Sequence, residues 1–400
     1  MKTSLATRET VAGFDDLDEI QLGRRSGVKW ARAVSAGTVP AWVADMDYPL
    51  AVPIRQALRQ LIDDGDLGYP NWPGGSPLRA QFAHRMADRY NWHPEADAVR
   101  EQTDLIQALQ LILRLASHPG DVIAIQTPNY PPFPATLQTM GLTAVDMPFI
   151  DTQAGWRIDF AAFTAALHRH RPKALVLVNP HNPTGRVHTR AELIQIAALA
   201  EEFDLLVISD EIHAELVYQP ARHIPFASLS QDAAARTVTI TSAGKAFNLA
   251  GLRCAIAHFG PEWLLDRRDA EPPDLYGAVS VPGVAATLAA WQHGDQWQDS
   301  LLAVLDRNRR RVHHVLSEQV PLLRQHLPEA TYLAWCDVAA LGIDDPVAAV
   351  RKHGRVMVDG GVPFARGAGQ FIRINFATSS SILERILCGV VEGLTVTRQC

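Results

Sequence analysis

Three polar residues that follow short apolar runs could together hold an aldehyde cofactor. Lys245 lies in the small-residue segment SAGKAFN, Asp210 ends the run LLVISD, and Asn182 lies in the loop NPHNPTGRV. A partly desolvated lysine amine has a lowered pKa and forms imines readily. A carboxylate beside a pyridine nitrogen keeps that nitrogen protonated, so that the ring can accept electrons from a substrate carbanion. Taken singly, each residue has an ordinary explanation, because most lysines are solvated and a strand-end aspartate often caps a helix.

The order and spacing of these residues resemble a known family. Asp210 follows Asn182 by 28 residues (210 minus 182), and Lys245 follows Asp210 by 35 (245 minus 210). With Asn-Pro-Thr-Gly around Asn182, this arrangement resembles the fold type I, class I/II aminotransferase-like enzymes, which use pyridoxal 5'-phosphate (PLP). Further segments narrow the resemblance to the MalY/PatB-type cysteine-S-conjugate (cystathionine) β-lyases: AWVADMDYPL at 41–50, LGYPNWPGG at 67–75, SDEIHAELVY at 209–218, KAFNLAGL at 245–252 and ATYLAWCD at 330–337.

The resemblance implies that five residues surround the cofactor ring. Lys245 would be the Schiff-base lysine and general base, Asp210 would pair with the pyridine nitrogen, and Asn182 would hydrogen-bond the phenolate oxygen. Tyr130, in TPNYPPF, matches the aromatic residue that stacks on the ring. His213 stands where aminotransferases proper commonly carry a tyrosine, so its polar contact near the cofactor would be a property of the lyase branch. A structural histidine after a strand is the alternative reading of His213.

The resemblance also implies a cradle for the cofactor phosphate. Ser242, Arg253 and Tyr69 match family positions, and the family contributes this tyrosine from the neighbouring subunit. A guanidinium group, hydroxyl donors and a helix N-terminus together suit a dianion. Because Tyr69 has this role only if a second subunit supplies it, we expect a homodimer with active sites at the subunit interface.

Two residues depart from the family pattern near the phosphate. Gly244 stands where many relatives have a hydroxyl residue before the lysine, and Asp104 stands where relatives often have glycine or serine. An acidic residue beside a phosphate is unfavourable unless its side chain points away. Leu105 and Ile106, which follow Asp104, are candidates for binding the cofactor. These departures indicate a specialised member of the branch.

One arginine and the family resemblance together suggest the substrate and the reaction. Arg373, in FIRINFA, matches the arginine that grips the substrate α-carboxylate, and its fork of donors suits this role better than a lysine. A surface ion pair is the alternative, which the surrounding apolar residues disfavour. The resemblance implies a carbon–sulfur β-lyase that converts an S-substituted L-cysteine, such as cystathionine, to thiol, pyruvate and ammonia.

Other reactions use the same set of residues. An aminotransferase acting on an L-amino acid is the first alternative, and a decarboxylating or oxidative-deaminating enzyme acting on a cysteine S-conjugate in specialised metabolism is the second. A third alternative, from another functional class, is a regulatory protein that retains PLP without useful turnover. The presence of Lys245, Asp210, Asn182 and Arg373 together argues against this last one.

The elements that must position these residues form an alternating pattern. The apolar runs at 121–126, 174–179, 205–210 and 237–242 predict buried strands, and the amphipathic stretch at 190–203 predicts a helix. Strands that alternate with helices imply a largely parallel sheet, whose carboxyl ends bind ligands. We expect an α/β, PLP-dependent transferase-like (aspartate aminotransferase) fold of type I, with a mainly parallel seven-stranded sheet in the large domain and a smaller α+β domain. The expected domains are an N-terminal segment at 1–49 that joins the small domain, a large PLP-binding domain at 50–283 and a small domain at 284–400.

Composition sets limits on partners and location. The net charge of −6 and the isoelectric point near 6.2 argue against a nucleic-acid-binding protein and favour a small-molecule substrate. No apolar run resembles a signal peptide or a membrane span, so a cytoplasmic enzyme is expected. Cys254, Cys336, Cys388 and Cys400 lack the spacing of a disulfide framework or zinc site and are interpreted as small buried hydrophobes, with one at the C-terminus.

Overall fold

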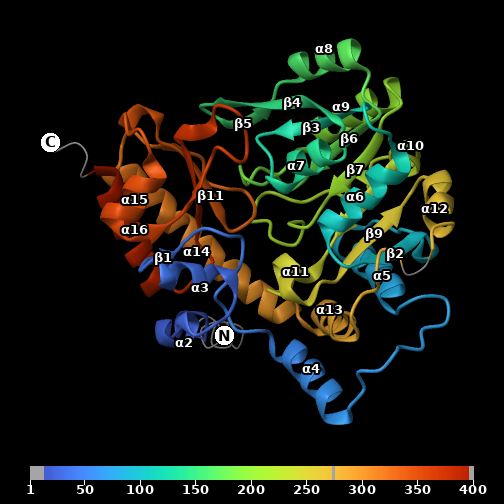
Figure 1. Ribbon diagram of the computed structural model, residues 1–400, viewed down its shortest axis with the longest axis horizontal. Coiled ribbons are helices and arrows are strands. Elements are labelled where there is room, and N and C mark those ends of the chain that lie inside the picture. Colours follow the sequence, from blue (N-terminus) through green and yellow to red (C-terminus); the bar gives the residue numbers. More distant parts are fainter. Residues whose placement is uncertain (1–12, 273–274, 396–400) are drawn as a thin grey trace. The chain divides into compact units, whose positions relative to one another are not determined.

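Within a computed structural model that describes residues 13–272 and 275–395, the chain forms two compact units (Figure 1). The larger unit comprises the described residues of Leu50–His181 and Val187–Asp295. The smaller unit comprises those of Met1–Pro49, Asn182–Arg186 and Gln296–Cys400. Segments far apart in the sequence therefore build the smaller unit.

A single twisted sheet organises the larger unit. Its strand order is β2-β9-β8-β7-β6-β3-β4-β5. The central neighbours β8, β7, β6, β3 and β4 run parallel, whereas β2, β9 and β5 pair antiparallel. The strands are β2 (Val99–Gln102), β3 (Val122–Thr127), β4 (Thr143–Thr152), β5 (Gly155–Ile158), β6 (Ala174–Val178), β7 (Leu206–Asp210), β8 (Thr237–Thr241) and β9 (Ala255–Phe259).

The described sheet has eight strands, one more than expected from the sequence. At one edge, β5 folds back on β4 as an antiparallel hairpin, with Phe149 opposite Ile158. Both side chains are buried. Burial of this apolar surface stabilises the hairpin at the edge of the sheet. The four predicted apolar runs are confirmed as β3, β6, β7 and β8.

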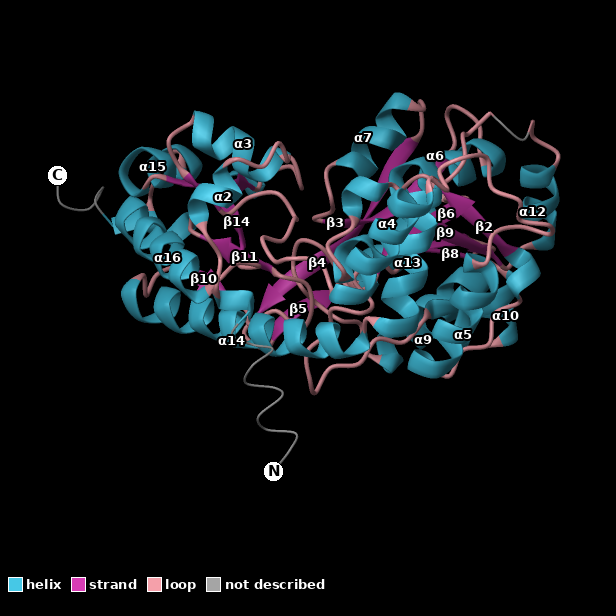
Figure 2. Ribbon diagram, turned by 90° about the horizontal axis from the view of Figure 1, so that it is seen from below, coloured by secondary structure: helices cyan, strands magenta, loops and turns pink. Residues whose placement is uncertain are grey.

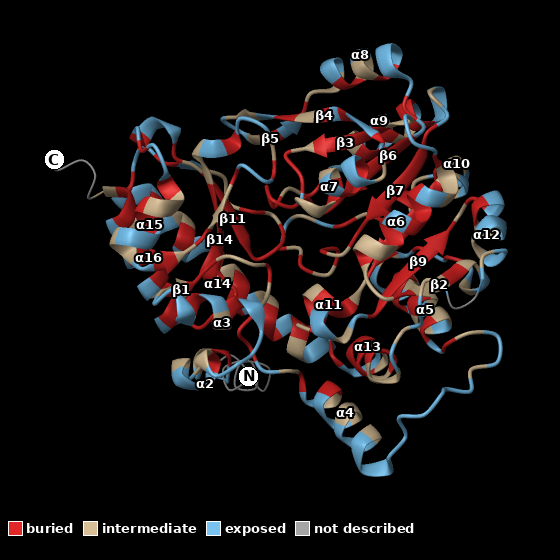
Figure 3. Cartoon of the chain, in the orientation of Figure 1, coloured by how far each residue is buried: buried red, intermediate tan, exposed pale blue. Residues whose placement is uncertain are grey.

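Helices cover both faces of this sheet, with α6 and α7 on one face and α9 and α10 on the other (Figure 2). Leu109 and Ile112 of α6 and Phe133 of α7 belong to the buried apolar core, and the buried strands are visible in Figure 3. The helices of this unit are α4 (Val52–Asp64), α5 (Leu78–Tyr90), α6 (Leu105–Ala116), α7 (Pro132–Thr139), α8 (Phe160–His170), α9 (Arg190–Glu202), α10 (Gln231–Ala235), α11 (Ala243–Ala246), α12 (Glu262–Asp269) and α13 (Val281–His293).

The predicted helix at 190–203 is α9, and its ends and faces follow from its sequence. Thr189 and Glu192 form a capping box, in which each side chain bonds the backbone N–H of the other residue. Leu193, Ile196 and Leu199 are buried, as their helical spacing predicts. The helix links β6 to β7 and thereby makes these two strands parallel neighbours.

The smaller unit has an antiparallel sheet in the order β10-β11-β14-β13 and a parallel pair of β1 and β12. The strands are β1 (Val39–Pro40), β10 (Arg324–Gln325), β11 (Leu333–Asp337), β12 (Val356–Met357), β13 (Asp359–Gly360) and β14 (Phe371–Asn375). The helices are α2 (Glu19–Gly23), α3 (Val28–Ser35), α14 (Asp295–Gln319), α15 (Pro346–Gly354) and α16 (Ser380–Thr395). The β1–β12 pair joins the N-terminal segment to the C-terminal part of the chain.

The two units differ from the expected domains at two places. Helix α13, which runs across the expected domain boundary at residue 283, packs against α4 in the larger unit, and α14 follows after Gly294. Asn182–Arg186 groups with the smaller unit, because the Gly185 carbonyl accepts hydrogen bonds from the backbone N–H groups of Glu329 and Ala330, both 2.9 Å long. Within the described part of the chain, no helix is both long enough and apolar enough to cross a membrane.

Candidate functional site

Asp210 and Lys245 lie after neighbouring parallel strands of the large sheet. Asp210 is the last residue of β7, and its register partner on β8 is Ile240, five residues before Lys245. The Asp210 backbone is fixed on both sides, since its carbonyl accepts from the Asn179 N–H at 3.0 Å and the following N–H, of Glu211, donates to the Ile240 carbonyl at 2.9 Å. The sheet therefore brings the predicted acid and the predicted amine to one edge.

The Asp210 carboxyl group is buried and has little access to water. One of its oxygens accepts a hydrogen bond of 3.0 Å from the Ile212 backbone N–H. Burial raises the pKa of Asp210 to about 7, and the Glu211 charge adds to this rise, while the Ile212 N–H and the nearby Lys245 charge oppose it. A cationic group beside Asp210 would restore the ionised form, so the residue fits the predicted partner of a pyridinium nitrogen.

Glu211 and His223 support the strand end behind Asp210. The Glu211 carboxylate accepts from the Ser209 hydroxyl at 2.8 Å and from the Phe226 N–H at 3.0 Å, and it contacts His223 Nε2 at 2.9 Å. All of these groups are buried, so the network holds the backbone after β7 in one conformation. This support could not be predicted from the sequence, because His223 lies twelve residues beyond Glu211 in an irregular segment.

Tyr130 and His213 also follow strands of the large sheet. Tyr130 comes after β3, is exposed, and packs edge-on against Phe133 with ring centroids 5.9 Å apart. His213 comes after β7 and is buried. Burial lowers the pKa of His181 well below its usual value, and His188 and, to a smaller extent, His213 lower it further. Tyr130 and His213 thus lie at the carboxyl end of the sheet, where Asp210 also lies.

The predicted phosphate residues cluster around the start of α6 and α11. Ser242 is the N-cap of α11; its hydroxyl accepts from the Gly244 N–H at 2.9 Å and donates to the Cys254 carbonyl at 2.6 Å. That bond places Ser242 next to Arg253, whose backbone is left-handed (φ 54°). The Arg253 guanidinium forms an ion pair with Asp104, the N-cap of α6. Arg253, Ser242 and the α6 N-terminus therefore belong to one region of the larger unit.

The two departures from the family pattern have structural consequences. A Cβ at Gly244 would come within 3.0 Å of the Ser242 hydroxyl oxygen, so a side chain here would crowd that hydroxyl. Asp104 does not point away from the predicted phosphate residues, since its carboxylate holds Arg253. Leu105 and Ile106 are the first two residues of α6, which places their backbone N–H groups at its positive end.

Tyr69 is the one predicted residue of the larger unit that the structure leaves apart from the others. It lies between α4 and α5 and is fully exposed. No hydrogen bond or ring contact is made by its side chain within the described residues. The predicted contact of Tyr69 with a phosphate is therefore not formed by its side chain within this unit.

The smaller unit holds Arg373 and Asn182 together. Arg373 lies on β14 and is buried; its Nη1 donates to Asn182 Oδ1 at 2.9 Å, and its Nη2 pairs with Asp359. The guanidinium carbon is 4.7 Å from the centroid of the Phe364 ring. Its Nε is buried without a hydrogen-bond partner among the described residues. The group is therefore a fixed guanidinium, not a surface side chain.

The contact with Arg373 also determines how the Asn182 amide is oriented. A guanidinium group only donates hydrogen bonds, so the Asn182 atom that faces it must be the oxygen. The Asn182 amide nitrogen then remains to donate to another acceptor. This orientation suits the predicted hydrogen bond to a phenolate oxygen.

Asp359 is a residue near the predicted site that the sequence analysis missed. It faces Arg373 directly across the β13–β14 pair. Nothing in the local sequence VMVDGG indicates this neighbour, because cross-strand pairing joins residues distant in sequence. The paired carboxylate gives the arginine a counter-ion within the chain itself.

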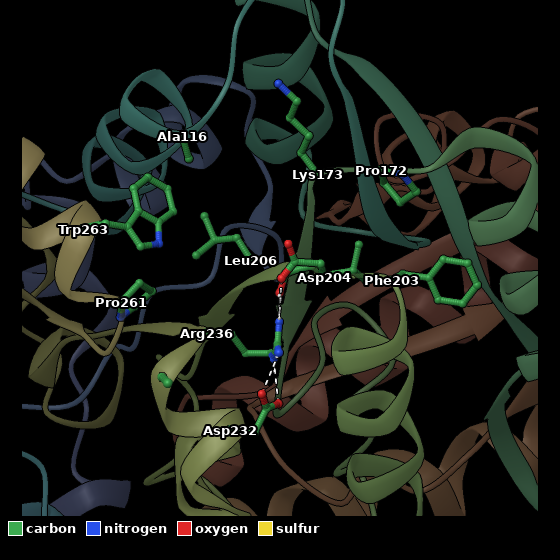
Figure 4. Close-up of a pocket in the computed structure, with 12 residues that line it drawn as sticks. Ala116, Pro172, Lys173, Phe203, Asp204, Leu206, Asp232, Arg236, Pro261 and Trp263 are labelled. Atoms are coloured by element: carbon green, nitrogen blue, oxygen red, sulfur yellow. Dashed lines mark hydrogen bonds and ion pairs between the residues drawn. The ribbon is translucent and has the colours of Figure 1, made fainter.

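A surface pocket lies at the other end of the large sheet, where β6 and β7 begin (Figure 4). Its volume is about 560 Å³, and it contains none of the predicted site residues. Arg236, which lines it, is held by Asp232 at 2.6 Å and by Asp204 at 3.4 Å, and Lys173 pairs with Asp121 at 2.7 Å. The charged groups of this pocket are balanced against one another, so we do not assign a site there.

The described cysteines correct one expectation. Cys254 and Cys336 are buried as expected, and burial raises the pKa of their thiols to about 11 and about 12. Cys388, by contrast, is exposed, because it lies on the outer face of α16. Cys400 lies outside the described residues. Neither buried thiol is a reactive thiolate at neutral pH.

This chain matches a known family over most of its length. The family described as Aminotransferase class I and II matches residues 43–390. A protein named putative cystathionine beta-lyase from Mycobacterium leprae (strain TN) is 36% identical over 390 residues, covering 92% of this chain and 94% of that protein. Cystathionine beta-lyase PatB of Bacillus subtilis (strain 168) is 31% identical, covering 93% of this chain and 97% of PatB.

A solved structure agrees with these sequence matches. The PLP-bound C-S lyase from Staphylococcus hominis has a TM-score of 0.87 and 28% identity, covering 95% of this chain and 98% of that one. The chain belongs to the aminotransferase class I and II family. The predicted family and fold class are thereby confirmed.

Proposed function

We propose that this protein is a PLP-dependent carbon–sulfur β-lyase, which converts an S-substituted L-cysteine to a thiol, pyruvate and ammonia. The observation that carries the proposal is the buried Asp210 carboxyl group next to Lys245 at the ends of adjacent parallel strands. The names of the relatives, cystathionine beta-lyase and C-S lyase, favour this reaction over the others that the same residues support.

The proposed roles of the ring-binding residues follow from their chemistry. When bound, PLP supplies an electron-accepting ring that stabilises negative charge at the substrate α-carbon. Lys245 would hold the cofactor aldehyde, and its amine, once the substrate amine has displaced it, would take the α-proton, while Asp210 would keep the pyridine nitrogen protonated. Asn182 donates its amide N–H to the phenolate oxygen. Tyr130 covers the ring, and His213 supplies a polar contact beside it.

The substrate and phosphate groups are anionic, and each has its own proposed cation. Arg373 binds the substrate α-carboxylate, for which a buried, planar guanidinium is suited. Arg253, the Ser242 hydroxyl and the backbone N–H groups of Leu105 and Ile106 bind the phosphate. The proposed phosphate site is supported by the position of these four groups in one region of the larger unit.

We further propose that the enzyme is a cytoplasmic homodimer. Tyr69 is fully exposed, and Ile62 and Leu67, which precede it closely in the sequence, are exposed apolar residues. A second subunit packed on these residues would remove apolar surface from water. In the dimer, Tyr69 would donate its hydroxyl to the phosphate bound by the other subunit.

The experiment that tests the reaction measures two of its products together with carbon dioxide, the product of the competing decarboxylation. Purified protein is incubated with L-cystathionine or another S-substituted cysteine, and thiol, pyruvate and carbon dioxide are assayed alongside the visible spectrum. Equal amounts of thiol and pyruvate, without any need for an added keto acid, are expected. Lys245→Ala should abolish both products. Conversion of the cofactor to its pyridoxamine form, or release of carbon dioxide, would replace the lyase assignment with transamination or decarboxylation.

A further inference from the structure

Asp104 makes two contacts at the start of α6. Its Oδ1 accepts a hydrogen bond of 2.8 Å from the Gln107 N–H, which caps the helix, and its Oδ2 pairs with Arg253 Nη2. The Arg253 side chain is 65% exposed and that of Asp104 is 23% exposed. The carboxylate therefore serves the helix with one oxygen and occupies the proposed phosphate-binding arginine with the other.

The donors around Asp104 are those that an anion would use. The backbone N–H groups of Leu105 and Ile106 have no hydrogen-bond partner in residues 13–272 and 275–395. The N–H of Thr103, two residues before Leu105, is already bonded to the Gln107 side chain at 2.9 Å. Two backbone donors at the positive end of a twelve-residue helix thus remain, beside an arginine that already has a negative partner.

We propose that Asp104 competes with the cofactor phosphate for Arg253 and thereby weakens the binding of PLP. The inference rests on the proposed phosphate site. A phosphate dianion that approaches the α6 N-terminus must draw Arg253 from Asp104 or share it, and the two anions repel each other. Gly244 has no side chain, so it contributes no hydroxyl to the phosphate in compensation.

The size of the effect follows from the exposure of the pair. An exposed ion pair changes an equilibrium constant by at most about fivefold, because water and salt screen it. Repulsion between Asp104 and the bound phosphate adds a factor of similar size. Removal of the Asp104 charge should therefore tighten PLP binding roughly 5- to 20-fold.

The test compares two aldehydes that differ only in the phosphate. PLP and unphosphorylated pyridoxal are titrated separately into the full-length, cofactor-free protein, and binding is followed by quenching of tryptophan fluorescence. Asp104→Asn should tighten PLP binding by the stated factor and leave pyridoxal binding within about twofold. Asparagine caps a helix as well as aspartate does, so the start of α6 is retained. Asp104→Ser, which also caps, should behave in the same way if the asparagine variant folds poorly.

Two controls separate the charge of Asp104 from its cap. Asp159 caps α8 by the same kind of bond, to the Ala162 N–H at 2.9 Å, and pairs with no cation among the described residues. Asp159→Asn should change neither titration. In an Arg253→Gln background, Asp104→Asn should have a smaller effect on PLP than in the wild type.

Each other result has a definite meaning. Unchanged or weaker PLP binding by both Asp104 variants would overturn the competition, as would equal tightening of PLP and pyridoxal. If the wild-type protein binds pyridoxal and PLP equally well, and Arg253→Gln has no effect on PLP, the proposed phosphate site itself is wrong.

Discussion

The two groups of proposed site residues differ in how their charges are balanced. In the larger unit, Asp210 is a buried acid that receives one backbone hydrogen bond, and its pKa is raised to about 7. In the smaller unit, Arg373 is a buried base with Asn182, Asp359 and the face of Phe364 around it. Asp210 lacks a full counter-charge, whereas Arg373 already has one in Asp359.

This difference separates cofactor binding from substrate binding. A protonated pyridine nitrogen supplies the charge that Asp210 lacks, so PLP should stabilise the larger unit as it binds. A substrate carboxylate instead meets an arginine that is already neutralised by Asp359, so it must share the guanidinium group with a carboxylate of the chain. We therefore expect PLP to be a structural as well as a chemical requirement, and substrate binding to be a competition.

The largest effect is expected from Asp210→Asn, which tests whether Asp210 lacks a counter-charge until PLP binds. We expect kcat with a cysteine conjugate to fall by about 100-fold or more, because an amide cannot keep the pyridine nitrogen protonated. The cofactor-free variant should nevertheless be more stable than the cofactor-free wild type at pH 8, since asparagine carries no charge to bury. Steady-state kinetics and thermal melts of both forms measure the two effects.

The pH dependence of that stability has a definite sign. The pKa of Asp210 rises from 3.8 to about 7 on folding, so the folded chain binds more protons than the unfolded chain between these values. Wild-type stability contributed by this group therefore falls as pH rises through that window. The advantage of Asp210→Asn should grow from pH 4 to pH 7 and then level off, at no more than about 4 kcal/mol. A constant difference across this range would show that the Asp210 charge is already balanced in the cofactor-free protein.

The smaller unit is tested by Arg373→Lys. Lysine keeps the positive charge but loses the planar fork, so KM should rise by roughly 10- to 100-fold, as the loss of a charged hydrogen bond predicts. The dissociation constant of PLP should change much less than KM, because Asp210 belongs to the other unit and Arg373 acts on the proposed cofactor contacts only through the orientation of Asn182. A rise in the dissociation constant of PLP as large as the rise in KM would contradict the separation of substrate binding from cofactor binding.

Much of the larger unit could be predicted because its signals are local. The apolar runs that became β6, β7 and β8 are continuous in sequence, and a parallel sheet places their carboxyl ends together, which accounts for the adjacency of Asp210 and Lys245. The family resemblance supplied the roles of these residues, which spacing alone does not determine.

The missed features depend on contacts between distant parts of the chain. The pairing of Asp104 with Arg253 joins residues 149 positions apart, and the position of Asp359 opposite Arg373 depends on strand register. Neither contact leaves a periodic pattern in the sequence. Four of the eight described strands of the large sheet were named from the sequence, and β5 was not among them, because it has only four residues and its pairing with β4 depends on a short hairpin.

The smallest expected effect, and the sharpest test of the comparison, comes from Asp359→Asn. The variant removes a charge that competes with the substrate carboxylate but keeps an oxygen that can accept from Arg373, so KM should fall about two- to fivefold while kcat changes little. In an Arg373→Lys background the same change should have less effect, because the fork for which both carboxylates compete is gone. A rise in KM would mean that Asp359 holds the guanidinium in its binding orientation, and the arginine of the smaller unit would then depend on its partner as Asp210 depends on the cofactor.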